Sequence, residues 1–171
     1  MDTQSLEYSK GLLDEIEAAI APLELKLTRL EPEQTGGIPT GLIGALKGPD
    51  GSRWEIACNV IPSHVDELST AFVQLYLQLT APAPDRQGEL ADFVRGCNEQ
   101  FIVGSLLLFS GCLCMKYTLT LDPEQPLPAE HFQSALVAFV RQAGAYARLG
   151  GEIAAGRLSA AEALSGSRGN S

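Results

Sequence analysis

The chain has 171 residues, 45% of them hydrophobic and 19% charged, and this composition predicts one globular domain. Twelve Lys and Arg residues against 21 Asp and Glu give a formal net charge of −9, without any basic run. Phosphate backbones and anionic membrane surfaces repel such a chain, so we expect no nucleic acid and no membrane among its partners.

Two further features of the sequence bear on the compartment. The first residues lack the basic-then-apolar order of a secretion signal. The longest uncharged run, residues 100–115, is shorter than the about 20 residues that span a bilayer. The four cysteines are then most simply reduced thiols, and we expect a cytoplasmic protein.

The first fifty residues predict a helix followed by strands. Hydrophobic residues at helical spacing indicate a helix that ends at Pro22. Apolar and polar residues alternate from Leu23, which is typical of a strand with one solvated face. Residues 31–40 are a loop rich in proline and glycine, and residues 42–46 are a second short strand.

A hairpin is predicted next, around a Gly-Pro-Asp-Gly turn at residues 48–51, because proline presets φ and glycine accepts a positive φ. Its returning strand alternates over residues 54–60 and gives way to a loop at residues 62–64. Residues 67–80 fit both a helix and a strand. Their unbroken period of two, with Thr, Tyr, Val and Phe present, favours the strand.

The second half begins with a short helix over residues 87–98, where apolar residues recur at spacings of three and four. Residues 101–109 are an almost continuous apolar strand. A two-residue turn at 110–111 joins it to a returning strand over residues 112–121.

A last long helix is predicted behind Pro126 and Pro128, because a proline in the first turn of a helix loses no hydrogen bond. Its buried stripe begins at Phe132, and the glycine pair at 150–151 is expected to bend or end it. A capping box over residues 159–162 predicts one extra turn.

The resulting order, α-β-β-β-β-α-β-β-α, predicts the α+β class, with helices packed against an antiparallel sheet. We expect a single domain over residues 1–156. Residues 157–171 would be a short C-terminal extension, and the composition of residues 165–171 predicts disorder.

The cysteines do not form a metal-binding pattern. Cys112 and Cys114 share one strand face with a single residue between them, whereas zinc ligands are typically paired with two to four residues between them. Cys58 and Cys97 fall on predicted core faces, where cysteine behaves as a small hydrophobic residue. We therefore expect no bound metal.

Motifs of catalysis are equally absent from the sequence. His64 and His131 lie in no known local signature, and Gly-x-Ser-x-Gly does not occur. Residues 41–47 resemble a phosphate loop only faintly, since Leu46 and Gly48 stand where Gly and Ser or Thr are needed. We expect no catalytic residues and no cofactor, and hence no enzyme.

One stripe of side chains is a candidate partner-binding surface. Phe72, Gln74, Tyr76 and Gln78 would share the strand face opposite the aliphatic residues of 67–80. Aromatic residues with few charges match the composition of interface cores. The competing interpretation places this stripe under a helix, as part of the core.

Residues 90–156 carry a resemblance to a known family. They combine a helix that ends at Asn98, an apolar hairpin and a long amphipathic helix, followed by Tyr146, Leu149, Ile153 and Gly156. This order resembles the YbjN-type sensory transduction regulators, which are grouped with the type III secretion chaperone-like fold. The resemblance implies that fold in a small acidic cytoplasmic protein, commonly dimeric and without catalytic residues. Chaperones of this fold hold extended client segments along the sheet and helix surface.

The sequence and the resemblance together lead to two functional expectations. The first is a non-enzymatic protein-binding module, chaperone-like or a regulatory adaptor, that acts as a homodimer with a protein partner of unknown identity. The alternative is a small enzyme or ligand-binding regulator with a pocket between the sheet and the last helix. A cleft with convergent polar groups would favour this alternative.

Overall fold

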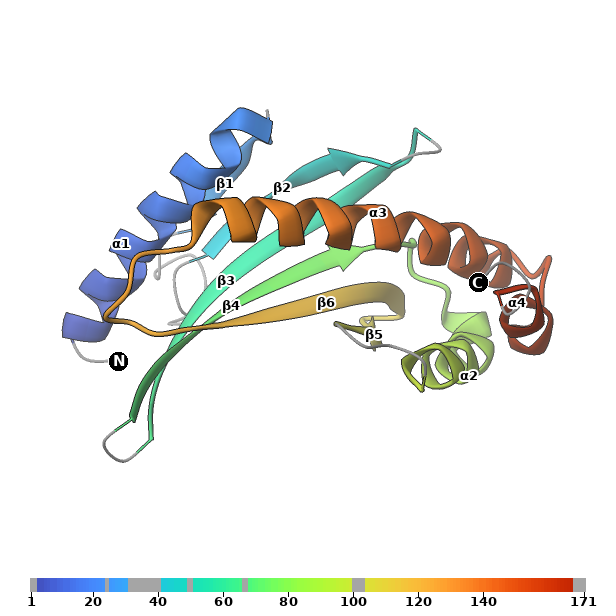
Figure 1. Ribbon diagram of the computed structural model, residues 1–171. Coiled ribbons are helices and arrows are strands. Elements are labelled where there is room, and N and C mark those ends of the chain that lie inside the picture. The colour runs from blue at the N-terminus through green and yellow to red at the C-terminus, as the bar shows by residue number, and fades with distance from the viewer. Residues whose placement is uncertain are drawn as a thin grey trace.

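The computed structural model describes residues 3–23, 25–30, 41–48, 51–65, 68–99 and 104–167. They form a six-stranded antiparallel sheet with the strand order β1-β2-β3-β4-β6-β5. Helices α1 and α3 lie on one face of this sheet, and α2 and α4 gather at one end (Figure 1). The α+β class and the predicted element order are confirmed, and α4 is added at the end.

The bounds of the elements are as follows. The α-helices are α1 (Thr3–Ile20), α2 (Gln87–Asn98), α3 (Ala129–Ala154) and α4 (Ala160–Ser167). The strands are β1 (Leu27–Leu30), β2 (Gly41–Lys47), β3 (Arg53–Val65), β4 (Leu68–Gln78), β5 (Ser105–Phe109) and β6 (Cys112–Leu121). The 3-10 helices of the described residues are η1 (Ala21–Leu23) and η3 (Pro84–Arg86).

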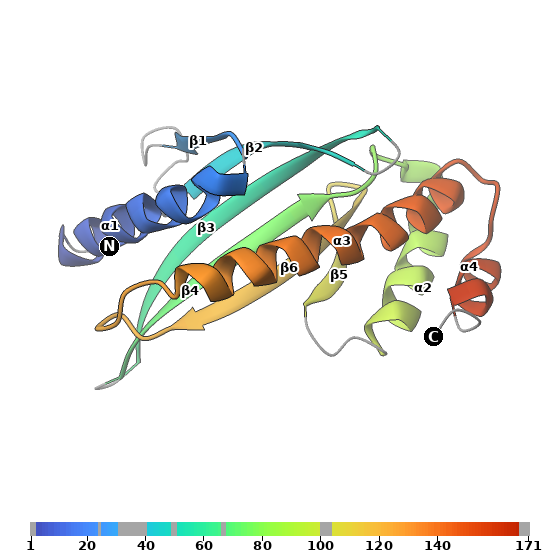
Figure 2. The ribbon, with the colours of Figure 1, turned by 45° about the horizontal axis from the view of Figure 1, so that its top comes forward.

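The core lies between the sheet and the helices α1 and α3, which run across the same face (Figure 2). The ambiguous segment is a strand, β4, paired with β3 and β6 in the middle of the sheet. Every second residue of β4 is buried, from Ala71 to Leu77. Strict alternation decides the question, because only a period of two puts all these side chains on one face.

Polar contacts fix α1 to its neighbours. Arg29 on β1 donates to Asp14 and Glu17 of α1 at 2.7 and 2.6 Å. The backbone N–H of Leu127, just before α3, donates to the Glu15 carboxylate at 2.6 Å. The acidic face of α1 therefore connects the first strand and the last long helix.

The predicted start of the first strand at Leu23 is wrong. Residues 21–23 continue the helical course of α1 as η1, and β1 begins only at Leu27. The α-helix itself stops at Ile20, because Pro22 has no backbone N–H with which to continue its hydrogen bonding. The expected loop at residues 31–40 and the central residues of the turn at 48–51 lie outside the described residues. The turn itself is closed by the Gly51 N–H, which donates to the Gly48 carbonyl at 3.0 Å.

The loop predicted at residues 62–64 is also wrong, because β3 continues to Val65 and pairs with β4 along its whole length. Proline is normally excluded from central strands because it lacks an N–H. Pro62 escapes this rule because the pairing of β2 with β3 ends at Asn59. Beyond that point, β4 is the one neighbour of β3 among the described strands.

The helix α2 has the predicted bounds, and the following strand is shorter than predicted. β5 begins at Ser105, after Gly104, whose φ of +79° interrupts an extended course, and residues 101–103 lie outside the described part. The turn at Ser110 and Gly111 has positive φ at both residues, 50° and 79°. Positive φ values at both residues give a two-residue turn whose twist matches that of the strands it joins.

The helix α3 does not end at the glycine pair 150–151 but continues to Ala154. Gly150 lies against β6, where a Cβ atom would come within 2.3 Å of a methyl group of Leu113. This glycine therefore serves the close approach of helix and sheet rather than ending the helix.

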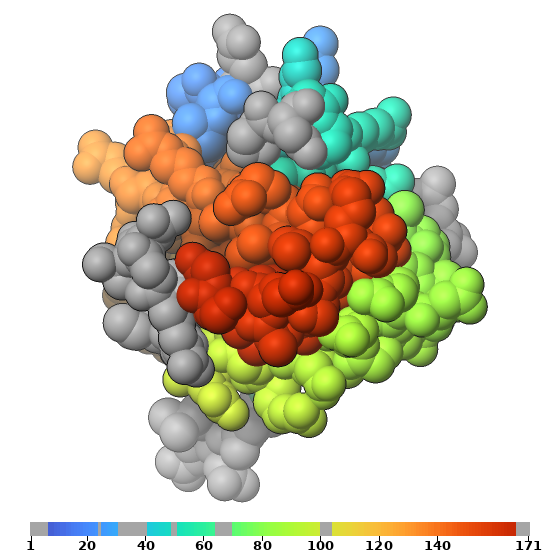
Figure 3. Space-filling view, turned by 90° about the vertical axis from the view of Figure 1, so that its right-hand side faces the viewer, coloured from blue at the N-terminus to red at the C-terminus, as the bar shows by residue number. Residues whose placement is uncertain are grey.

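The helices α2 and α4 and the last turns of α3 lie together at one end of the molecule (Figure 3). Polar contacts hold this end together. Arg86 donates to the carbonyl groups of Ile153 and Leu158 at 3.1 and 3.2 Å. The predicted capping box is present, since the Ser159 N–H donates to Glu162 at 2.8 Å. It starts a helix of eight residues rather than one turn. Residues 165–167, expected to be disordered, belong to that helix, and residues 168–171 lie outside the described part.

Candidate functional site

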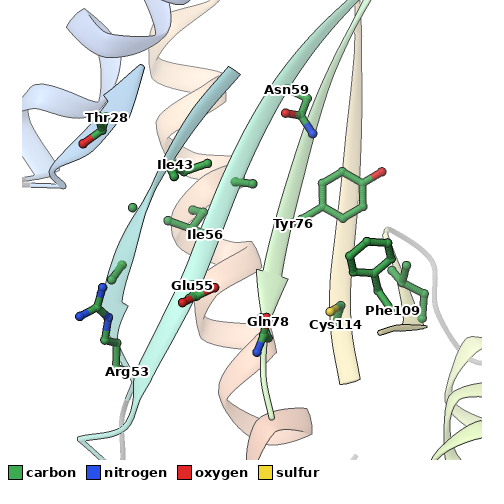
Figure 4. A pocket seen from close by; sticks show the side chains of 14 residues that line it. Thr28, Ile43, Arg53, Glu55, Ile56, Asn59, Tyr76, Gln78, Phe109 and Cys114 are labelled. Atoms are coloured by element: carbon green, nitrogen blue, oxygen red, sulfur yellow. The ribbon is translucent and has the colours of Figure 1, made fainter. Parts of the chain in front are cut away.

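The face of the sheet opposite α1 and α3 is called here the open face. Phe72, Gln74, Tyr76 and Gln78 all lie on it and are partly exposed, while the residues between them are buried in the core. In Figure 4 the side chains of Tyr76 and Gln78 project from β4, and α3 passes behind the sheet. The competing interpretation of this stripe as core under a helix is therefore wrong.

The stripe is ordered by its own contacts. The Tyr76 hydroxyl donates to the Gln74 side-chain oxygen at 2.9 Å. The Lys116 ammonium group, on the neighbouring β6, lies 5.9 Å from the centre of the Tyr76 ring, within the range of a cation–π interaction. Gln78 donates to the Thr80 carbonyl at 3.2 Å. The first two contacts constrain the Tyr76 ring, and the third constrains the Gln78 amide group.

A hollow of about 730 Å³ lies on the open face and is called here the open-face hollow. All six strands of the sheet contribute to its lining, namely Thr28, Ile43, Gly44, Ala45, Arg53, Glu55, Ile56, Ala57, Asn59, Tyr76, Gln78, Leu107, Phe109 and Cys114. Phe109 and Ile43 are 67% and 42% exposed, although both are large and hydrophobic. The rings of Tyr76 and Phe109 lie near each other at one side of the hollow (Figure 4).

The hollow offers recognition groups more readily than reactive ones. Its charged side chains among the described residues are Arg53 and Glu55. Burial raises the pKa of the Cys114 thiol to about 11, so this cysteine stays protonated at neutral pH. A thiol attacks as its thiolate, and protonation therefore disfavours Cys114 as a nucleophile.

The remaining cysteines and histidines are dispersed. Cys58 and Cys97 are buried in the core, where desolvation raises their pKa values to about 12 and about 11. Cys112 is buried beside Cys114 on the open face. His131 is exposed in the first turn of α3, and the side chain of His64 lies outside the described part. Within the described ranges, no three His, Cys, Asp or Glu residues are placed to hold a metal ion.

A second concavity, called here the β2–α3 groove, lies between the sheet and the last long helix and measures about 570 Å³. Its described lining residues are Leu23, Leu25, Lys26, Ala45, Leu46, Lys47, Leu136, Val137, Val140 and Arg141. The sequence does not point to these residues, because they come from three distant segments and only the tertiary fold brings them together. The one weak signal in the sequence is Val137, a hydrophobic residue outside the buried stripe of α3, and the structure shows it exposed.

Comparison with protein-family models finds no match for this chain, and comparison with curated proteins finds none either. Among the helices of the described residues, none combines the length and apolarity needed to cross a membrane.

Proposed function

We propose that the chain is a non-enzymatic protein-binding module, chaperone-like or a regulatory adaptor, that acts as a homodimer and meets its protein partner through the open face. The observation that carries this proposal is the stripe of Phe72, Gln74, Tyr76 and Gln78, which none of the described helices covers. A resemblance to the YbjN-type regulators and the type III secretion chaperone-like fold remains part of the proposal.

The chemistry of the open face supports a protein partner. Aromatic rings give large rigid contact areas, and amide and hydroxyl groups supply adaptable hydrogen bonds. The exposure of Phe109 at 67% adds an apolar side chain that binding would cover. The hollow spreads over several strands, so a partner could lie across the sheet.

The edge of the sheet formed by β5 is less suited to a partner than the open face. At β5, the side-chain amide of Asn98 donates to the Leu106 carbonyl and accepts from the Leu106 N–H, both at 2.8 Å. An added strand would need these backbone groups. Blocking them favours recognition by side chains of the open face.

The double substitution Phe72→Ser/Tyr76→Ser tests the proposal. We expect the variant to fold, because both rings are partly exposed, and to lose the partner that the tagged wild-type protein recovers from lysate of its native host. Recovered proteins are identified by mass spectrometry, and sedimentation equilibrium gives the oligomeric state. Circular dichroism and thermal unfolding check the fold.

The matched control is Ala138→Ser/Gln142→Ser, at exposed positions of α3 on the other side of the molecule. It should keep both the partner and the oligomeric state. An unfolded double variant would show that the two rings belong to the core. A wild-type protein that stays monomeric at high concentration and captures nothing would also contradict the proposal.

A second candidate function, a ligand-binding regulator, is favoured by one specific observation. The pocket it requires, between the sheet and the last long helix, has a counterpart in the β2–α3 groove. This groove and the open-face hollow are lined mainly from opposite faces of the sheet, so the two candidate functions can be tested separately.

A further inference from the structure

The β2–α3 groove exists because β1 is shorter than β2. β1 begins at Leu27, which pairs with Gly44. The last residues of β2, Ala45–Lys47, therefore have no partner in β1, although they still pair with β3. On this side η1 and Leu25, which precede β1, lie outside the sheet, and the middle of α3 faces them. A concave space remains between these three segments.

The floor of the groove is apolar. Leu23 and Val137 are 38% and 36% exposed, and they are two of the four large hydrophobic residues that are exposed in the described ranges. The remaining apolar side chains of the floor are Leu25, Leu46, Leu136 and Val140. Covering such a surface is favourable in proportion to the apolar area removed from water.

The charge of the groove is opposite to that of the protein. Lys26 and Lys47 line it from the sheet side and Arg141 from α3, and no acidic residue is among its described lining residues. None of the three cations forms an ion pair with a described residue. Three positive charges thus surround an apolar floor in a chain whose net charge is −9.

We propose that the β2–α3 groove binds a single-chain anionic amphiphile, in which an alkyl chain carries a carboxylate, sulfate or phosphate group. The alkyl chain covers the floor of Leu23, Val137 and their neighbours. The anionic group lies between Arg141 and the two lysines, where a guanidinium and ammonium groups donate charged hydrogen bonds.

The size of the groove selects this class of occupant over a protein segment. Its volume of about 570 Å³ falls within the roughly 300–1,000 Å³ of small-molecule sites. Ten described residues line it, whereas a standard protein interface takes about 20–30 residues from each side. This inference gives the second candidate function its ligand class and does not depend on the open face.

Isothermal titration calorimetry with sodium laurate, below its micelle concentration, tests the proposal on the full chain. We expect one laurate per chain. Dodecyl maltoside and dodecyltrimethylammonium, with the same alkyl chain, should bind at least about tenfold more weakly because they lack the anionic group. Octanoate should also bind at least about tenfold more weakly, because fewer methylene groups are buried.

Two pairs of variants locate the site. Lys47→Gln/Arg141→Gln should weaken laurate binding about tenfold, while Lys10→Gln/Arg148→Gln, which removes the same charge at exposed positions elsewhere, should leave it unchanged.

Val137→Glu places a carboxylate on the floor of the groove and should weaken binding at least about tenfold. Ala138→Glu, at the exposed neighbouring position, should have no effect. Thermal unfolding confirms that each variant is folded.

Several results would overturn the proposal. These are equal affinity for the three head groups, no response to the groove variants, or binding to anionic phosphatidylglycerol vesicles without binding to monomeric laurate. A Leu-Glu repeat peptide that binds at least tenfold more tightly than laurate would assign the groove to a protein segment instead. Phe72→Ser/Tyr76→Ser should retain laurate binding, so failure of the open-face proposal is distinguished from failure of this one.

Discussion

Two adjacent glycines in α3 have different surroundings, although the sequence presents them as one pair. Gly150 is buried against β6, and a Cβ atom there would come within 2.3 Å of a Leu113 methyl group and 3.5 Å of a Thr80 methyl group. A Cβ atom on Gly151 would meet nothing within 4 Å. Neither residue has the positive φ that requires glycine, so the surroundings alone distinguish them.

We therefore expect opposite effects from the same substitution. Gly150→Ala forces the fully buried Leu113 to move and should lower the free energy of unfolding by about 1–3 kcal/mol. Gly151→Ala adds a better helix former at no steric cost and should raise it by about 0.5–1 kcal/mol. Urea unfolding followed by circular dichroism measures both. Equal effects of the two substitutions would contradict the role assigned to Gly150.

At the scale of single elements, β5 depends on a residue from outside the sheet. Asn98, the last residue of α2, supplies the two hydrogen bonds that a further strand would supply at Leu106. An amide can do this because it carries one acceptor and one donor group side by side. The helix α2 thereby fixes the edge of the sheet while it packs against β5.

Asn98→Ala should leave the buried Leu106 N–H and carbonyl groups without partners and lower the free energy of unfolding by about 1–3 kcal/mol. Amide hydrogen exchange should accelerate most at Leu106. Gln125→Ala, at an exposed position in the segment before α3, is the control and should change neither quantity. Unchanged exchange at Leu106 in the Asn98 variant would exclude the role of this amide.

The helix α4 should respond to acid through its capping box. Hydrogen bonds from the Ser159 N–H and hydroxyl groups lower the pKa of Glu162 below its ordinary value of 4.5. A carboxyl group whose pKa is lower in the folded state stabilises that state above its ordinary pKa, and this contribution is lost as the pH falls through the lowered pKa. We expect amide exchange in α4 to accelerate below about pH 4.5 more than in α3. In Glu162→Gln, whose side chain does not titrate, the difference in amide exchange between α4 and α3 should no longer depend on pH. An unchanged pH dependence in this variant would contradict the role assigned to Glu162.

At the scale of the whole molecule, the last described residues pack onto the rest of the chain. Ala160 and Ala163 of α4 are buried, and Leu164 lies against Gly96 of α2. The Glu89 carboxylate accepts from the Ala160 N–H at 2.7 Å. The extension predicted over residues 157–171 therefore contains a helix in contact with α2 and α3.

A chain that ends at Gly156 should be less stable by about 2–3 kcal/mol, because it exposes the apolar surface that α4 covers on α2. The free energy of urea unfolding measures the loss. Ser165→Ala, at an exposed position of α4, is the control and should have little effect. A shortened chain of unchanged stability would show that α4 contributes nothing to the fold.

Much of this fold follows from local patterns in the sequence. The helix over residues 87–98 has its predicted bounds, and every second residue of β6 joins the core as the alternation predicts, namely Leu113, Met115, Tyr117, Leu119 and Leu121. The same alternation predicts that Phe72, Gln74, Tyr76 and Gln78 of β4 share one face, as they do. Each of these predictions depends on apolar residues that recur every two or every 3.6 residues, a pattern that is present in the sequence alone.

The remaining features depend on neighbours that are distant in sequence. Pro62 is accepted in a strand because the pairing of β2 with β3 does not extend past Asn59, and Gly150 belongs to a helix that passes close to β6. The positions of α1 and α3 decide which face of the sheet is open. Tertiary packing alone brings Lys26, Lys47 and Arg141 to one groove. The sequence by itself thus determined the elements and their faces, while tertiary structure decided where strands end, which face is covered and where charges meet, because those depend on contacts between segments.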